Sequence, residues 1–309
     1  MPTRKLWGAA TINSILGDQA SIIIDLSKPT HEATWCPGLP AVVKNKLVIE
    51  SAWVEKEGAN TFNLYIPPKP IIGDKDKAGP WREHGEKLWG DDLPHIEKWL
   101  AYRVQHPNIK INHGLVTGSP TQGVGKDSFL HPVARAVGSS NFKDISARRA
   151  FNDAADKNSF LQAVILRINE VHDLVEKRFA FYDVTKDWMA APPPTIQVSD
   201  KWLVQHPIFN MVGVILTSNH KTDGLYLDSE DRRHYVAWSN VTPADFGGSE
   251  AERAAYWNEL WNWYGEPGNR DAGVEHNKPA ADKNKPIDPP IVTTSYAGTG
   301  TRKRGGVRH

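Results

Sequence analysis

A glycine-rich segment between Gly118 and Ser128 holds the residue types that a phosphate-binding loop needs. The segment reads Gly118-Ser-Pro-Thr-Gln-Gly123-Val-Gly125-Lys126-Asp127-Ser128, follows an apolar run and opens a predicted helix. Bound phosphates require backbone N–H groups that turn inward, which glycine permits, a helix N-terminus behind them, and a lysine that reaches the outer phosphates. The sequence therefore predicts a nucleotide-binding loop; a glycine-rich turn without a ligand is the alternative. The residues expected to contact the nucleotide are Gly118, Gln122, Gly123, Val124, Gly125, Lys126, Asp127 and Ser128.

This segment departs from the common G-x-x-x-x-G-K-[ST] pattern at two positions. Pro120 occupies the place of the first glycine, and Asp127 stands where a serine or threonine hydroxyl would hold Mg²⁺. Because magnesium accepts carboxylate oxygens readily, either Asp127 or Ser128 is expected to reach the metal.

A glutamate follows the next strongly apolar run along the chain. Residues 163–168 are apolar apart from Arg167, and Asn169 and Glu170 come directly after them. An acidic residue at the end of such a strand can hold Mg²⁺ through water or polarise an attacking water molecule. Glu170 is therefore the candidate base and a candidate metal contact, and the alternative is a glutamate that is merely solvated.

An amide follows the third apolar run, residues 211–217. Asn219 lies in Thr217-Ser-Asn-His220, and a polar side chain on the strand beside a phosphate-binding loop can orient water against the γ-phosphate. The sequence predicts this role for Asn219, although the same residues could form a simple helix cap or turn.

Two arginines, Arg232 and Arg233, precede a short apolar run at 234–238. An arginine that reaches the phosphates of a neighbouring subunit accelerates hydrolysis by roughly 10³- to 10⁵-fold in other nucleotide hydrolases. Arg232 or Arg233 is the candidate for this role. The alternative is surface charge that pairs with nearby acidic residues, namely Asp228, Glu230 and Asp231.

The elements that must position these residues alternate between apolar strands and helices. The expected strands are 111–117, 163–168, 211–217 and 234–238, and the expected helices are 126–137, 147–155, 171–191 and 249–263. This alternation predicts an α/β fold with a parallel sheet flanked by helices. Residues 191–201, which include three consecutive prolines, read as a loop that leads into a hairpin.

Composition shifts divide the chain into four expected regions. Residues 1–75 look small, irregular and β-rich, with β-branched runs at 21–26 and 46–50, and residues 76–108 form a helical lead-in. Its helix is expected to open at an acidic pair, Asp91-Asp92, and to end at Pro107. Residues 109–265 hold the core, and residues 266–309 read as a disordered basic tail.

Charge and composition exclude several classes of protein. Lys and Arg total 37 and Asp and Glu total 36, so a surface that is basic all over is excluded, although a local basic channel is not. The single cysteine excludes an internal disulfide and a cysteine-rich zinc site. The apolar run at 209–216 is too short to span a bilayer and the N-terminus does not read as a signal peptide, so a cytoplasmic protein without a membrane partner is expected.

The ordered set of motifs resembles superfamily 3 helicases, and more closely the helicase domain of phage- and prophage-encoded primase-helicases. The resemblance covers roughly residues 60–264, including a lead-in at Thr61-Phe-Asn-Leu-Tyr65 before Pro67-Pro68. The motifs that carry it are Lys110-Ile-Asn-His-Gly-Leu-Val116, Gly123-Val-Gly-Lys-Asp127, Asn219-His-Lys-Thr-Asp-Gly224 and Asp231-Arg-Arg-His-Tyr-Val-Ala-Trp-Ser239. It implies a P-loop NTPase fold of the AAA+-like type and an aspartate after Lys126.

This resemblance implies an ATP-dependent DNA helicase of a phage or mobile element that acts in a bacterial host. ATP and Mg²⁺ would bind between the subunits of a homo-hexamer, and Lys126 would contact phosphate. Glu170 would be the acidic ATPase residue, Asn219 the sensor, and Arg232 or Arg233 the arginine finger. Single-stranded DNA would contact a loop at 195–201 through Lys201, and a separate primase or polymerase would supply any priming.

Two features depart from the family and keep other functions open. Asn169 stands where the family often has a first acid, and the stretch after Gly265 does not resemble the family's C-terminal region. Together with Asp127, these features allow a nucleotide-binding module that does not hydrolyse ATP and that loads or inhibits a replication protein. Another P-loop motor, such as a packaging ATPase, is the second alternative.

Overall fold

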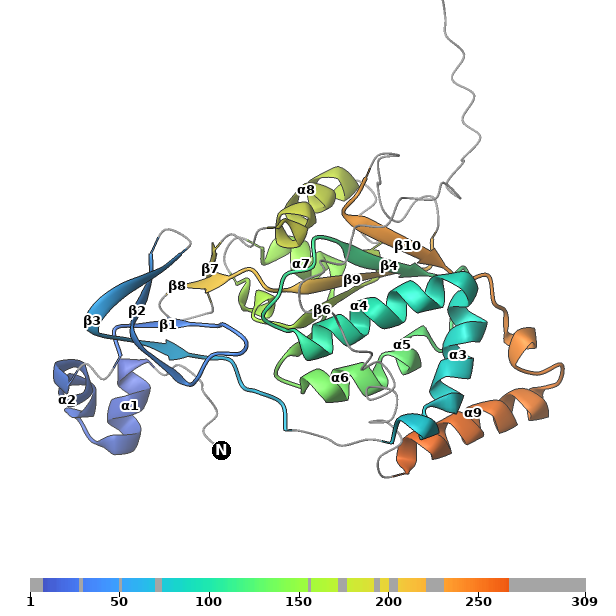
Figure 1. The fold of residues 1–309 in the computed structure, drawn as a ribbon, viewed down its shortest axis with the longest axis horizontal. Helices are drawn as coiled ribbons and strands as arrows, with labels where there is room; N and C mark the ends of the chain where they lie inside the picture. The colour runs from blue at the N-terminus through green and yellow to red at the C-terminus, as the bar shows by residue number, and fades with distance from the viewer. Residues whose placement is uncertain are drawn as a thin grey trace, which may run out of the picture.

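The structure is a computed structural model that describes residues 8–27, 30–49, 52–69, 74–154, 157–171, 177–191, 195–199, 205–220 and 231–266. Its largest part is a sheet with helices on both sides, and a small sheet lies beside it (Figure 1). The expected tail lies outside the described residues, apart from Glu266. Among the described residues, no helix has the length and apolar character needed to cross a bilayer.

The main sheet contains five strands, all of them parallel. They are β4 (Gly114–Gly118), β5 (Phe142–Ser146), β6 (Ile165–Asn169), β9 (Gly213–Ser218) and β10 (His234–Trp238). Their order across the sheet is β10-β4-β9-β6-β5. The expected α/β fold with a parallel sheet is therefore confirmed, and each expected strand is present, although β4, β6 and β9 begin two or three residues later than the apolar runs suggest.

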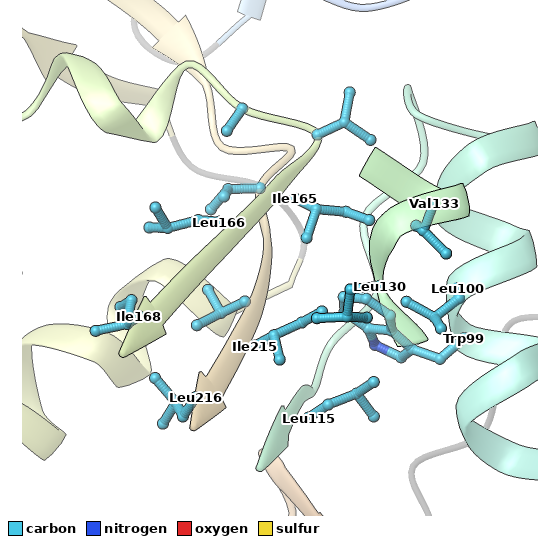
Figure 2. Packing of buried hydrophobic residues seen from close by; sticks show 14 of the residues in the cluster. Trp99, Leu100, Leu115, Leu130, Val133, Ile165, Leu166, Ile168, Ile215 and Leu216 are labelled. Atoms are coloured by element: carbon cyan, nitrogen blue, oxygen red, sulfur yellow. The ribbon is translucent and has the colours of Figure 1, made fainter. Parts of the chain in front are cut away.

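Burial on both faces explains why the central strands read as continuous apolar runs. Side chains alternate between the faces, so Ile165 and Ile215 point toward helix α4, whereas Leu166 and Leu216 point away from it (Figure 2). All four are fully buried. The carboxyl ends of these strands are thereby held together, and the predicted site residues follow them.

Helices cover both faces of this sheet. Helix α4 packs on one face, and α8 lies on the other (Figure 1). The expected helix at 126–137 is divided at Leu130, one residue before the next helix begins, and Pro132 then occupies its first turn. The helices of this region are α3 (Gly79–Trp89), α4 (Leu93–Gln105), α5 (Lys126–Phe129), α6 (His131–Val137), α7 (Ala147–Asn152), α8 (Arg178–Met189) and α9 (Glu250–Gly265). Short 3₁₀ turns lie at Lys75–Lys77, Gly90–Asp92, Ser159–Leu161 and Pro243–Phe246.

A fully buried arginine ties α4 to the amino ends of the central strands. Arg103 donates hydrogen bonds to the carbonyl oxygens of Ile109 (2.6 Å), Val164 (3.1 Å) and Met211 (2.6 Å). Because buried carbonyl groups need partners, these bonds fix where β6 and β9 begin. Burial lowers the pKa of Arg103 to about 10, so the guanidinium stays charged near neutral pH.

The N-terminal region forms a second sheet with the order β1-β3-β2. Strand β1 (Glu32–Thr34) is parallel to β3 (Ala52–Asn63), and β2 (Val42–Ile49) is antiparallel to it. β7 (Thr195–Val198) and β8 (His206–Phe209) form the expected hairpin, but β7 already lies within residues 191–201, which were expected to be a loop. The hydroxyl of Thr34 donates to the carbonyl oxygen of Pro207 (2.9 Å), which joins this sheet to the hairpin.

The β-branched run at 21–26 is helical, so the expectation of a strand there is wrong. Two helices, α1 (Ala9–Leu16) and α2 (Ala20–Ser27), occupy this part of the chain. The side chain of Asn13 accepts a hydrogen bond from the Ser21 N–H (2.8 Å), one of the donors that a helix N-terminus leaves without an internal partner. This local cap outweighs the weak strand preference of three isoleucines.

Candidate active site

A cavity of about 580 Å³ lies where the carboxyl ends of β6 and β9 meet the glycine-rich loop that follows β4. Each predicted contact from 122 to 128 lines it, and Glu170 and Asn219 line it as well. The full lining is Gln122, Gly123, Val124, Gly125, Lys126, Asp127, Ser128, Asn169, Glu170, Thr217, Ser218, Asn219, Trp257 and Trp261. Three motifs that lie far apart in the sequence therefore meet around one space.

The loop takes a backbone conformation that favours glycine. Gly123 has φ +74° and Gly125 has φ +86°, and Gly125 directly precedes the first residue of α5. A Cβ at Gly125 would lie 2.6 Å from the His84 ring and 2.7 Å from Trp257. Packing and backbone conformation both exclude a side chain at this point, so the loop passes close to the helices beneath it.

Gly118 has a different role from the one expected for it. It ends β4 and does not line the cavity that the described residues form. A Cβ at this position would lie 2.0 Å from the ring of Trp238 on the neighbouring strand β10. The missing side chain therefore makes room for an indole, and the nearest loop glycine at the cavity is Gly123.

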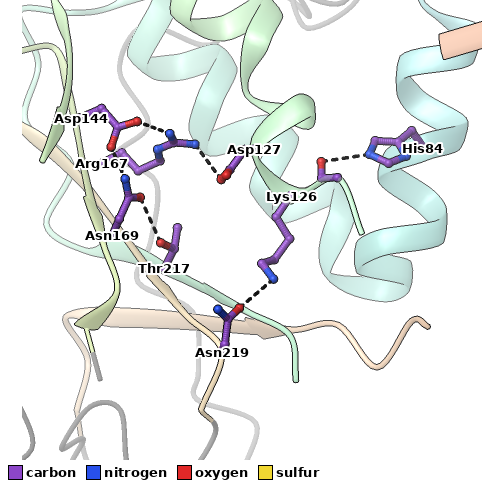
Figure 3. Close-up of polar contacts among 9 residues, drawn as sticks. His84, Lys126, Asp127, Asp144, Arg167, Asn169, Thr217 and Asn219 are labelled. Carbon is purple, nitrogen blue, oxygen red and sulfur yellow. Dashed lines mark hydrogen bonds and ion pairs between the residues drawn. The ribbon is translucent and has the colours of Figure 1, made fainter. Parts of the chain in front are cut away.

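The ammonium group of Lys126 points at the amide that follows β9. Lys126 Nζ lies 3.2 Å from Asn219 Oδ1 (Figure 3). It also lies 3.4 Å from the carbonyl oxygen of Thr121. Burial lowers the pKa of Lys126, and the carboxylate of Asp127 acts in the opposite direction. A cationic group and an amide thus converge on the same point of the cavity, as a bound outer phosphate would require.

Arg167 forms an ion pair with Asp127, the carboxylate that was expected to hold Mg²⁺. Its guanidinium pairs with Asp127 (2.8 Å), and also with Asp144 on β5 (Figure 3). Asn169 donates to Asp144 and accepts from the Thr217 hydroxyl (3.2 Å). The edge of the sheet is therefore a connected polar network, in which Asp127 is already neutralised by an arginine.

The remaining predicted metal contacts supply oxygen ligands, which are the kind that magnesium binds. Ser128 and Glu170 both line the cavity, and Mg²⁺ is held in such sites by one or two protein ligands together with water and phosphate oxygens. Asp127 fits this role only if it separates from Arg167. Among the described residues, no group of three or more His, Cys, Asp and Glu side chains is arranged to hold a metal by itself.

Glu170 adopts a conformation that is unusual for a residue with a side chain. It has φ +58° directly after β6, in the left-handed region, and its side chain is exposed at the cavity. This conformation costs roughly 1–2 kcal/mol for an L-amino acid, and such strain concentrates at functional sites. The backbone turn places Glu170 directly after the strand end, where it lines the cavity together with Asn169.

A buried histidine that was not predicted from the sequence supports the loop. His84 on α3 lies with Nε2 3.1 Å from the carbonyl oxygen of Gly125 and Nδ1 2.8 Å from the hydroxyl of Tyr256. Burial lowers the pKa of His84, so the ring is neutral at pH 7. Nε2 then donates to the carbonyl, and Nδ1 accepts from the tyrosine. No motif or spacing marks this residue, because both of its partners are distant in the sequence.

The two predicted arginines, Arg232 and Arg233, lie at the amino ends of the strands, whereas the glycine-rich loop lies at the carboxyl ends. β10 pairs in parallel with β4, so that His234 faces Gly114 and Trp238 faces Gly118. Arg232 and Arg233 precede the first pair, whereas the glycine-rich loop follows the last one. At about 3.3 Å per residue, the strand separates them from the loop by roughly 16 Å. They line a separate cavity of about 200 Å³ with Asn112, Ala190 and Ala191.

A buried carboxylate holds the turn that carries these arginines. Asp231 accepts hydrogen bonds from the Tyr182 hydroxyl (2.5 Å), the Arg233 N–H (2.6 Å) and His234 Nδ1 (3.1 Å). Burial alone would raise the pKa of Asp231, but the bonds from His234 and its other partners lower it to about 2. Lys201, the predicted DNA contact, lies outside the described residues. Asp228 and Glu230, the possible acidic partners of the arginines, lie outside them as well.

Comparison with known proteins shows the fold. No protein-family model matches the chain, and no curated protein matches it. Solved structures of the NrS-1 C-terminal region do match. The apo structure of its residues 305–718 has a TM-score of 0.60 at 16% identity and covers 87% of this chain and 60% of that one. An A-form apo structure has a TM-score of 0.61 at 17% identity, with 87% and 59% covered. The chain thus spans about 60% of the length of those chains.

Proposed function

We propose that this chain is an ATP-dependent motor that hydrolyses ATP between subunits and translocates along single-stranded DNA, as a DNA helicase of a phage or mobile element. The observation that carries the proposal is the convergence of Lys126, Glu170 and Asn219 on one cavity beside the glycine-rich loop. The fold likeness to the NrS-1 C-terminal region is compatible with this proposal.

Each residue of the cavity then has a defined task. The backbone N–H groups of the loop and the N-terminus of α5 bind the phosphates, and Lys126 neutralises the outermost charge. Asn219 exchanges its contact with Lys126 for one with the attacking water, which it orients. Glu170 polarises that water and accepts its proton at the carboxylate.

Magnesium supplies charge neutralisation between the phosphates when it is bound with ATP. Ser128 and Glu170 are the residues of this chain that would hold it. The contribution of Asp127 depends on Arg167, because the carboxylate can turn to a metal only when the guanidinium releases it. Asp144 also pairs with Arg167 and can retain the arginine after such a release.

The position of the arginines supports an assembly. Arg232 and Arg233 lie at the edge of the sheet away from the loop, so they serve the cavity of a second copy rather than their own. A repeated head-to-tail contact of this kind forms a ring when its rotation closes, and the proposed assembly is such a ring, a homo-hexamer. A single-stranded DNA would pass through it and contact Lys201, with a separate primase or polymerase as a partner.

Phosphate release tests this proposal. The purified chain is incubated with Mg²⁺ and ATP, with and without single-stranded DNA, and inorganic phosphate is measured. We expect release that DNA stimulates, together with ATP-dependent separation of a forked duplex. Release without strand separation would favour another P-loop motor, such as a packaging ATPase.

The ion pair between Asp127 and Arg167 favours one other candidate function. It neutralises a carboxylate at the expected metal position, and Asn169 replaces a possible second acid there. A chain with these features could bind nucleotide without hydrolysing it and act as a loader or inhibitor of a replication protein. Measurable ATP binding with no phosphate release, with or without DNA, would select this function and reject the motor.

A further inference from the structure

Two indole rings from the C-terminal helix line the candidate nucleotide cavity. Trp257 and Trp261 lie four residues apart on α9 and therefore on the same face of the helix. Neither belongs to the glycine-rich loop or to the strands that carry the polar residues. The lining that α9 contributes is thus aromatic, whereas the loop and the strand ends contribute charged and polar groups.

Trp257 is part of the packing that supports the loop. Its ring lies 5.6 Å from that of His84, in an edge-on contact, and 5.1 Å from that of Phe246. A Cβ at Gly125 would lie only 2.7 Å from its ring. Replacing Trp257 would therefore disturb the loop itself, and its role in the structure is fully accounted for by these contacts.

Trp261 is different, because 45% of its surface is exposed. Its ring makes an edge contact with His131 (5.3 Å between centroids, 79° between planes) and a tilted contact with Tyr264 (5.5 Å). A large aromatic surface that stays in water at the wall of a cavity is available to a flat apolar group. Helix α9 is held without it, through buried Leu260 and Tyr264, whose hydroxyl donates to the Ser128 carbonyl (2.7 Å).

The two walls together define the ligand that would fill the cavity. The loop and Lys126 bind a chain of phosphates, and the phosphates of a nucleotide carry a flat aromatic base at their other end. We propose that Trp261 is the platform on which this base stacks, and that the site takes a purine nucleoside triphosphate. This inference rests on the nucleotide-binding part of the proposed function, and it requires neither hydrolysis nor DNA.

Stacking on an indole recognises the face of a base rather than its edge. The larger purine ring overlaps the indole more completely than a pyrimidine does, so a purine nucleotide is expected to bind more tightly. Base stacking on an aromatic side chain changes affinity by roughly 10- to 100-fold. A ligand with phosphates and no base should be insensitive to Trp261.

Calorimetric titration of the full chain tests the platform with three probes. They are adenylyl imidodiphosphate, its uridine counterpart and inorganic tripolyphosphate. We expect Trp261→Ala to weaken binding of the adenine nucleotide about tenfold or more and to leave tripolyphosphate binding unchanged. Trp261→Phe should restore most of the affinity. Trp263→Ala is the matched control, because Trp263 lies on the same helix, outside the cavity lining, and donates to the Lys77 carbonyl (3.0 Å).

The outcomes separate this inference from the proposed function. The platform is wrong if Trp261→Ala binds the adenine nucleotide as tightly as the wild type does. It is also wrong if the substitution weakens tripolyphosphate binding as much as it weakens binding of the adenine nucleotide. In both cases the cavity assignment stands. If wild-type chain shows the expected pattern but releases no phosphate from ATP, the platform is supported and the motor is rejected. If the wild type binds neither nucleotide nor tripolyphosphate, both are rejected.

Discussion

At the scale of single residues, the chemistry depends on one ammonium group. Lys126 is half-buried, with an amide oxygen and a carbonyl oxygen as its hydrogen-bond acceptors, and both are groups that an outer phosphate would displace. Removing one such group from a phosphoryl-transfer site costs roughly 10²- to 10³-fold in turnover. Lys126→Ala should therefore lower phosphate release at least by this factor. Lys98→Ala, which removes an exposed lysine of α4, should leave the rate unchanged in the same assay.

A buried histidine predicts how stability depends on pH. Burial, with His95 and His234 nearby, lowers the pKa of His113 from 6.5 to about 3. Below pH 6.5 the unfolded chain therefore binds a proton that the folded chain does not, so stability falls as the pH falls. From pH 7 to pH 5, His113 should account for a loss of about 2 kcal/mol in the free energy of unfolding.

Urea unfolding of the wild type and of His113→Gln at both pH values measures this effect. The variant is expected to be less stable at pH 7, because it loses the contact with His95 (3.0 Å), but its stability should depend less on pH. An equal dependence on pH in the two proteins would show that His113 does not stay neutral in the folded state.

At the scale of elements, the loop is held by close packing as well as by backbone conformation. Gly123 and Gly125 form a matched pair, since both have positive φ, but a Cβ at Gly123 meets no atom within 4 Å. Gly123→Ala should cost roughly 1–2 kcal/mol through the backbone alone. Gly125→Ala adds overlap with His84 and Trp257, which costs a further 1–3 kcal/mol or so. Thermal unfolding checks this order, and equal melting temperatures for the two variants would contradict it.

The elements that the sequence predicted are those with a continuous apolar pattern. β6 and β9 are buried on both faces, so their runs of isoleucine, leucine and valine indicated strands directly. β5 was missed because it is an edge strand in which only Ile145 is buried, so its pattern of Phe142-Lys-Asp-Ile-Ser is mostly polar. The helix α2 was predicted as a strand because its cap comes from Asn13, in another element.

The same distinction holds for the candidate site. Lys126, Glu170 and Asn219 could be selected from the sequence, since each has a chemical role that is recognised from the residue type and the element before it. Arg167 and Trp261 could not. Arg167 matters through its pairing with Asp127, 40 positions away, and Trp261 through the packing of α9, and neither contact leaves a local pattern.

At the scale of the whole molecule, the sheet separates the two halves of the proposed catalytic site. The loop and Lys126 lie at the carboxyl ends of the strands, and Arg232 and Arg233 lie at the amino ends. A chain with both arginines replaced by alanine should bind nucleotide normally and release little phosphate. Arg148→Ala, an exposed position on α7, is the control and should keep full activity.

Mixing two inactive variants tests whether the halves come from different copies. In an equal mixture of Lys126→Ala and the double arginine variant, about a quarter of all subunit contacts combine an intact lysine with intact arginines. Phosphate release should therefore recover to about a quarter of the wild-type rate. A mixture that stays inactive, while each variant still assembles with wild-type chain, would show that the arginines do not act between subunits.

The most direct measurement is a cryo-electron microscopy structure of the assembled chain with a non-hydrolysable ATP analogue and single-stranded DNA. We predict that the γ-phosphate lies within hydrogen-bond distance of Lys126 of one copy and of Arg232 or Arg233 of the next. An analogue bound away from Lys126, or a nucleotide that no neighbouring arginine reaches, would contradict the account.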